Sequence, residues 1–146
     1  MNIKFSTNPL KVIELFNFLK QCDKQFIPQL SYRVDLLEYT QKLILKSTII
    51  HAHFNNKIIG LIAFYANKPE LHYAYISLIC VLQQYEGQKV GKKLIEKCIL
   101  RIKAKGFKLL NLEVNSENSH AIEFYLKKGF KITRIELHSL YMTKSL

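Results

Sequence analysis

The sequence predicts an α/β fold built on one mixed sheet, and three observations lead to this prediction. Three apolar, strand-like segments follow one another between residues 48 and 82. An amphipathic helical segment then leads to another strand-like segment at residues 109–114, the pattern of a β-α-β crossover. The full order reads β-α-α-β-β-β-α-β-α-β-β. We therefore expect a mixed, mostly antiparallel sheet of about seven strands with four helices on its faces.

The first third of the chain contains one short strand and two helices. Residues 3–6 are a strand candidate, and Asn8-Pro9 reads as a helix N-cap followed by proline at the first helical position. Apolar residues at helical spacing continue to Cys22. Residues 26–32 are irregular, and Asp35 with Glu38 resembles a capping box, so a second helix begins at residue 36.

The middle of the chain supplies the sheet and the crossover helix. Residues 48–54 and 57–66 are predicted strands joined by a tight turn at Asn55-Asn56. Residues 73–82 form the third and most apolar strand. The helix at residues 92–105 buries one apolar face and ends at Gly106, because glycine readily adopts the left-handed conformation that closes a helix.

The last quarter of the chain completes the sheet. A strand at residues 109–114 precedes a helix at 119–128 that Gly129 closes. Residues 130–137 and 140–144 form a final hairpin. Its outer edge offers unpaired backbone groups to a second copy of the chain, so a homodimer is one hypothesis.

Composition indicates a single globular domain spanning residues 1–146. The chain has 49% hydrophobic and 23% charged residues, values that exclude a disordered polypeptide. We see no signal-peptide region and no apolar run of membrane-spanning length, so we expect no membrane partner. The cysteines, at positions 22, 80 and 98, lack metal-ligand spacing. Free thiols in a cytoplasmic protein are therefore expected.

The net charge of +11 has three interpretations. The first is a solvated lysine surface, and the second is attraction of an anionic ligand such as a nucleotide cofactor. The third is a nucleic-acid-binding module. The lysines are scattered along the chain without an interleaved aromatic platform, which argues against nucleic acid.

The polar loop at residues 83–91 connects the most apolar strand to a helix. A glycine-containing loop at a helix N-terminus binds anions, because several backbone N–H groups there lack a helical partner. An ordinary strand-to-helix turn is the alternative interpretation.

A second motif follows in the helix near the C-terminus. It reads Asn-x-x-Ala-Ile-x-Phe-Tyr-x-Lys-x-Gly-Phe from Asn118 to Phe130. This motif, the loop and the element order resemble the GCN5-related N-acetyltransferase (GNAT) superfamily. The resemblance implies a GNAT fold and direct transfer of acetyl from acetyl-CoA to a primary amine of a small molecule, without metal. A packing role for the aromatic pair is the alternative reading of the motif by itself.

The resemblance also implies roles for individual residues. Tyr125 would protonate the departing thiolate, Ile79 would stabilise the oxyanion through its N–H, and Asn118 would contact the pantetheine or adenine side. Glu86 and Lys89 depart from the family loop, which has arginine or glutamine and then glycine at these places. The cofactor-binding residues implied are Ile79, Cys80, Val81, Glu86, Gly87, Gln88, Lys89, Val90, Gly91, Lys92, Asn118, Tyr125 and Lys127.

Other chemistry-bearing residues leave several alternatives open. The general base is chosen among Tyr75, Ser77, His72, Glu113 and ordered water. Cys80 on an apolar strand reads as packing rather than as a covalent nucleophile. His51 and His53 share a strand face without a carboxylate or cysteine at ligand spacing, which argues against a metal site.

The acceptor site is expected on the loops at residues 26–35 and 67–70. Residues 26–35 resemble a segment of small bacterial GNAT members found with surface-polysaccharide genes, which suggests an amino-sugar nucleotide. The substrate-binding candidates are Phe26, Tyr32 for stacking, Arg33 for a phosphate, and Tyr75. A CoA-binding domain without catalysis is the alternative that Glu86 and Lys89 motivate.

Overall fold

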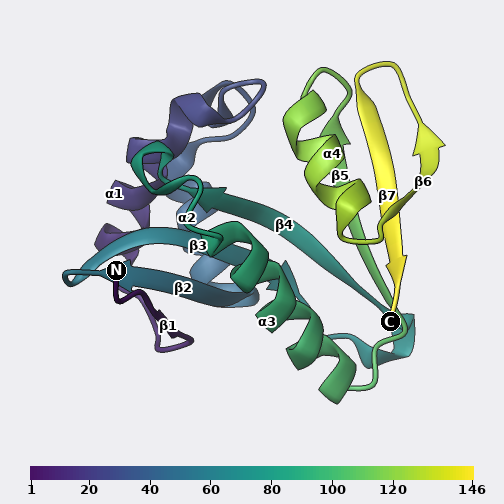
Figure 1. Cartoon of the computed structure of the whole chain (residues 1–146), viewed down its shortest axis with the longest axis horizontal. Helices are drawn as coiled ribbons and strands as arrows, with labels where there is room; N and C mark the ends of the chain where they lie inside the picture. The colour runs from purple at the N-terminus through teal and green to yellow at the C-terminus, as the bar shows by residue number, and fades with distance from the viewer.

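One seven-stranded sheet runs through the protein in the order β1-β2-β3-β4-β5-β7-β6 (Figure 1). The computed structural model describes residues 1–146. Every neighbouring pair is antiparallel except β4 with β5, which is parallel. The strands are β1 Lys4–Ser6, β2 Thr48–Phe54, β3 Lys57–Tyr65, β4 Tyr73–Val81, β5 Leu109–Asn115, β6 Lys131–Ile135 and β7 Ser139–Ser145.

The helices are α1 Val12–Cys22, α2 Leu36–Lys46, α3 Val90–Ala104 and α4 Ser119–Lys127. Short 3-10 turns occupy Asp23–Gln25, Leu30–Tyr32, Pro69–Leu71 and Gln83–Tyr85. The predicted fold class and element order are confirmed. No helix combines the length and the apolar composition needed to cross a membrane.

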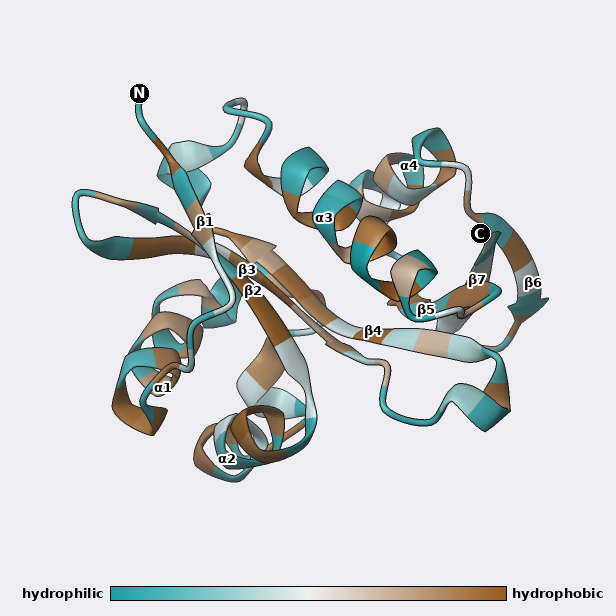
Figure 2. Ribbon diagram, turned by 90° about the horizontal axis from the view of Figure 1, so that it is seen from below, coloured by the Kyte–Doolittle hydropathy of each residue, from teal (hydrophilic) through white to brown (hydrophobic).

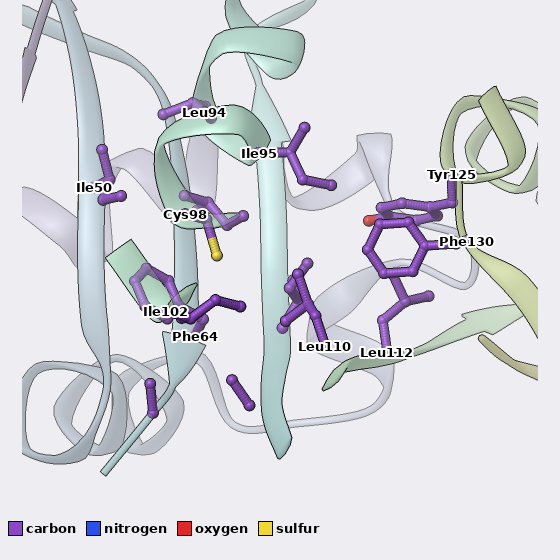
Figure 3. Close-up of a cluster of buried hydrophobic side chains, with 14 of the residues drawn as sticks. Ile50, Phe64, Leu94, Ile95, Cys98, Ile102, Leu110, Leu112, Tyr125 and Phe130 are labelled. Carbon is purple, nitrogen blue, oxygen red and sulfur yellow. The ribbon is translucent and has the colours of Figure 1, made fainter. Parts of the chain in front are cut away.

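The helices cover both faces of the sheet, α1 and α2 on one and α3 and α4 on the other (Figure 2). Each face has its own apolar core. The core beneath α3 and α4 contains 20 buried residues, among them Phe64, Leu94 and Phe130 (Figure 3). The core beneath α1 and α2 contains 11, among them Leu19 and Leu61.

Local signals placed most element boundaries correctly. The Asp35 carboxylate accepts the backbone N–H of Glu38 at 3.0 Å and caps α2. Asn55 and Asn56 have φ values of 51° and 62°, as a tight hairpin turn between β2 and β3 requires. α3 begins at Val90, two residues before the predicted start.

The predicted start of the first helix at Asn8-Pro9 is wrong, because α1 begins at Val12. The Glu14 side chain accepts the backbone N–H of Lys11 at 3.0 Å and so caps the helix there. The carbonyl of Asn8 instead lies 2.8 Å from Nε2 of His51 on β2. A contact with a distant strand therefore holds residues 8–10 out of the helix.

β4 separates from β5 soon after the two strands meet. They pair only where Tyr73–Tyr75 lie beside Leu109–Asn111, and further along they diverge (Figure 1). On the other side of β4, Leu78 pairs with Ala63 and Ile76 with Phe64, so Ser77 has no partner on β3. This bulge exchanges the two faces of β4. Ile76 consequently belongs to the core beneath α3 and α4, whereas Leu78 belongs to the core beneath α1 and α2.

Candidate active site

A cavity of about 870 Å³ lies where β4 and β5 diverge. Its walls come from both strands, the loop after α1, the start of α3 and one side of α4. The lining includes most of the residues expected at the site, namely Phe26, Arg33, Tyr75, Ile79, Cys80, Val81, Glu86, Gly87, Lys89, Val90, Gly91, Lys92, Asn118 and Tyr125. The fold therefore brings the two sequence motifs and the loop expected to bind the acceptor together around one space.

The register of β3 and β4 decides which backbone groups face the cavity. The N–H of Leu82 donates to the carbonyl of Ile59 at 2.8 Å, which makes these two residues a hydrogen-bonded pair. Such pairs alternate along an antiparallel ladder. Cys80 is therefore hydrogen-bonded to Leu61, whereas the N–H groups of Ile79 and Val81 point away from β3, toward the divergence.

The carbonyl of Val81 on this open edge is already engaged. It accepts a hydrogen bond from Nε2 of Gln25, in the turn after α1, at 2.8 Å. Oε1 of the same Gln25 side chain accepts the N–H of Gln83 at 3.2 Å.

The loop before α3 turns through two left-handed residues, Gly87 with φ 86° and Lys89 with φ 61°. Glycine adopts this conformation freely, whereas a side chain makes it costly for Lys89. The first backbone bond of α3 runs from the N–H of Lys93 to the carbonyl of Lys89. The N–H groups of Val90, Gly91 and Lys92 consequently have no helical partner and form an anion-binding end beside two lysine side chains.

Tyr125 on α4 is 7% exposed and packs against the ring of Phe130 (Figure 3). It also packs against the ring of Phe124. Its hydroxyl makes no hydrogen bond within the protein, and it is not sealed from solvent. Burial, with a smaller effect of the Cys98 thiol, raises the pKa of Tyr125. The phenol is therefore protonated at neutral pH where it meets the cavity.

Three of the individually expected residues lie outside the cavity lining, and so does the loop at residues 67–70, which was expected to help form the acceptor site. Lys127 forms an exposed ion pair with Glu123 at 3.2 Å, one turn earlier on α4. Tyr32 is 79% exposed, and Gln88 is also absent from the lining. Asn118 lines the cavity, but its Oδ1 also accepts the N–H of Ala121 at 3.2 Å and caps α4.

The cavity lining carries both charge signs. Arg33 comes from the loop after α1, and Glu113 comes from β5. One oxygen of Glu113 accepts the Ser139 hydroxyl at 2.7 Å. Burial raises the pKa of Tyr75. Glu113 and the hydroxyls of Tyr141 and Tyr39 raise this pKa further by smaller amounts, and Arg33 opposes them.

The four side chains considered as a general base differ in position. Tyr75, Ser77 and Glu113 line the cavity, whereas His72 lies in the turn before β4 and does not. The Ser77 hydroxyl is hydrogen-bonded to the Tyr39 hydroxyl at 2.8 Å.

Some lining residues escaped the sequence analysis, notably Gln25, His138 and Ser139. Their contacts cross large sequence separations, since Gln25 reaches Val81 and Ser139 reaches Glu113. No local pattern in the sequence marks them.

The histidine pair lies away from this cavity. A ring nitrogen of His51 contacts the ring of His53, and its other nitrogen contacts the Asn8 carbonyl. The structure contains no group of three or more His, Cys, Asp or Glu side chains arranged to hold a metal ion.

Comparison with known proteins adds a family assignment. The model of the Acetyltransferase (GNAT) family matches residues 12–130. An uncharacterised N-acetyltransferase of Methanocaldococcus jannaschii is 33% identical over 94 residues, which cover 62% of this chain and 42% of that protein. The chain spans about half the length of the curated relatives it matches.

Solved structures share the architecture. The PaiA N-acetyltransferase from Thermoplasma acidophilum, in complex with coenzyme A, superposes with a TM-score of 0.81 at 21% identity, covering 100% of both chains. A candidate streptothricin acetyltransferase from Bacillus anthracis, in complex with acetyl coenzyme A, is 28% identical with a TM-score of 0.63, covering 69% of this chain and 63% of that one.

Proposed function

Because the chain belongs to the acetyltransferase (GNAT) family, we propose that it transfers an acetyl group from acetyl-CoA to a primary amine of a small molecule. One observation carries the proposal. A single cavity combines an unpartnered helix N-terminus, an open strand edge and a protonated phenol without an internal hydrogen bond. An acyl thioester that ends in a nucleotide diphosphate needs these three features in this order.

The substrate acetyl-CoA would lie along the divergence of β4 and β5. Its diphosphate would meet the free N–H groups of Val90, Gly91 and Lys92, with the side chains of Lys89 and Lys92 adding positive charge. Its pantetheine arm would hydrogen-bond to the open groups of Ile79 and Val81, except for the Val81 carbonyl, which Gln25 occupies.

The transfer itself would be direct, with the amine attacking the thioester carbonyl. The N–H of Ile79 would stabilise the oxyanion, and Tyr125 would protonate the sulfur as the carbon–sulfur bond breaks. A covalent intermediate on Cys80 is disfavoured. The pKa of that thiol is strongly raised by the neighbouring Cys22 thiol and by burial, so it stays a poor nucleophile.

Among the base candidates we favour Glu113. It is a carboxylate that lines the acceptor side of the cavity, and the Ser139 hydroxyl holds it in place. It would accept the proton that an alkylammonium must lose before attack. Proton release through ordered water remains the alternative.

For the acceptor, the amino-sugar nucleotide suggested by residues 26–35 stays a hypothesis. Arg33 in the cavity wall supports it, because a guanidinium binds phosphate well. Stacking on Tyr32 lacks such support, since that ring is 79% exposed and lies outside the lining. A cytoplasmic location and pairing of two copies at the exposed edge strand β6 also stay predictions.

The decisive experiment combines binding with turnover. Calorimetry would measure the affinity for coenzyme A, and free-thiol release from acetyl-CoA would be followed with amino sugars, polyamines, amino acids and peptide N-termini. Turnover with at least one class is the expected result. Binding without turnover on any class would support the alternative, a CoA-binding domain that has lost catalysis, and no binding would overturn both.

A further inference from the structure

The loop after α1, residues 23–33, forms the acceptor wall of the cavity. Phe26, Ile27, Pro28 and Arg33 line the space. Two polar side chains of this segment fix the position of the wall. Asp23 holds the segment together, and Gln25 attaches it to β4.

Asp23 holds the segment together from inside. Its carboxylate is 8% exposed and accepts hydrogen bonds from Nε2 of Gln29 at 2.8 Å and from the N–H and hydroxyl of Ser31, each at 2.7 Å. Burial raises the pKa of Asp23, and the bonds from Gln29 and Ser31 lower it by more. The carboxylate therefore stays ionised at neutral pH and gives the segment a defined shape.

Gln25 attaches the shaped segment to β4. Its carboxamide donates to the Val81 carbonyl at 2.8 Å and accepts the Gln83 N–H at 3.2 Å, with the Cys80 sulfur 3.8 Å from Nε2. The amide thus bonds to β4 as the peptide group of a neighbouring strand would. No other hydrogen bond connects residues 23–33 to β4 or to the loop that follows it.

We propose that Gln25 is a positioning residue that couples the acceptor wall to the strand edge on which acetyl-CoA is proposed to lie. The inference rests on the proposed function. Its basis is geometric, because the two hydrogen bonds of Gln25 end on Val81 and Gln83. These two residues lie in the chain between Ile79, whose N–H is proposed to stabilise the oxyanion, and the start of α3, where the diphosphate is proposed to bind. A shift of this edge when acyl donor binds is transmitted to Phe26 and Arg33 through the carboxamide.

The proposal predicts different effects on the binding of the two substrates. Gln25→Ala removes the bridge, so we expect the KM for the amine to rise about tenfold, the effect of losing two ordinary hydrogen bonds. The dissociation constant for coenzyme A should change less than threefold, because the anion-binding end of α3 is untouched. Gln21→Ala is the matched control, since Gln21 is the same residue type, is exposed in the last turn of α1 and lies outside the cavity lining.

Hydrogen–deuterium exchange with coenzyme A tests the coupling without requiring turnover. In the wild-type chain we expect coenzyme A to slow exchange both at residues 86–92 and at residues 26–33. In Gln25→Ala the first protection persists and the second is lost, whereas in Gln21→Ala both persist. Gln25→Leu, which keeps nearly the size of the side chain but neither its donor nor its acceptor, repeats the test if the alanine variant does not fold.

The outcomes separate the two claims. Absence of protection at residues 86–92 in the wild type would overturn the proposed function and the inference with it. A second outcome would overturn the inference alone. In it, coenzyme A slows exchange at residues 86–92, and the slowed exchange at residues 26–33 survives in both Gln25 variants.

Discussion

The ring of Tyr125 lies edge-on against the ring of Phe130, with 5.5 Å between centroids and 65° between planes. The phenol ring therefore belongs to the core beneath α3 and α4. Its hydroxyl has no partner in the protein and reaches the cavity. The ring packs in the core while the hydroxyl stays available for the proton donation that we propose, so the two roles that the sequence presents as alternatives are compatible in one side chain.

Tyr125→Phe separates these roles. The ring and its contacts remain, so the thermal midpoint should change little. The proton donor is lost, so kcat should fall on the order of a hundredfold. Steady-state thiol release measures this, with Tyr141→Phe as a control because its hydroxyl bonds to Glu136 outside the cavity. Unchanged turnover in Tyr125→Phe would remove the phenol from the mechanism.

Glu113→Gln tests the proposed base. Glutamine keeps an oxygen for the Ser139 hydroxyl but cannot take a proton, so kcat/KM for the amine should fall about a hundredfold. Coenzyme A affinity should be unchanged. Glu117→Gln, on the turn before α4 and outside the cavity lining, serves as the control. A loss of less than about threefold would favour release of the proton to water.

Lys89→Gly relieves backbone strain at the start of α3. The lysine has a left-handed φ of 61°, which disfavours any residue with a side chain. We expect the free energy of unfolding to rise by about 1 kcal/mol in urea titrations. The matched change Lys92→Gly, inside the helix, should lower it by about 1 kcal/mol. A loss of stability in Lys89→Gly would show that the side chain itself stabilises the loop.

Stability should also depend on pH through His53. Burial and the neighbouring His51 lower the pKa of its imidazole, while Glu14 opposes them. The unfolded chain, with an ordinary histidine pKa of about 6.5, then binds more protons than the folded chain below that pH. We therefore expect the contribution of His53 to the free energy of unfolding to be fully present above about pH 6.5. This contribution should be lost as the pH decreases through the lowered pKa of the folded state.

Urea titrations between about pH 5 and 8 measure this dependence. His53→Gln should flatten the slope. An equal slope in wild type and His53→Gln would contradict the prediction.

Features that depend on neighbouring residues were predictable. The cap that Asp35 forms with Glu38, the turn at Asn55-Asn56 and the buried face of α3 all rest on contacts within about one helical turn or one hairpin. The start of α1 was mispredicted for the opposite reason. The partner that holds Asn8 out of the helix is His51, on a strand more than forty residues away.

The residues of the candidate site likewise fall into those that the sequence predicts and those that only tertiary contacts place. The loop at residues 83–91 and Tyr125 belong to short motifs, so their positions could be read from the sequence. The contributions of Gln25 and Ser139 depend on hydrogen bonds to Val81 and Glu113 that only the folded chain creates.

The sequence by itself determined the order of elements, the family resemblance and the helix that carries the phenol, because periodicity and motif spacing are local properties. The tertiary structure alone decided which backbone groups of β4 are open to a ligand. That choice depends on the register with β3, on the bulge at Ser77 and on the early separation from β5. Each of these is a pairing between distant segments, and the nearly continuous apolar run of β4 has no periodicity that specifies its partners.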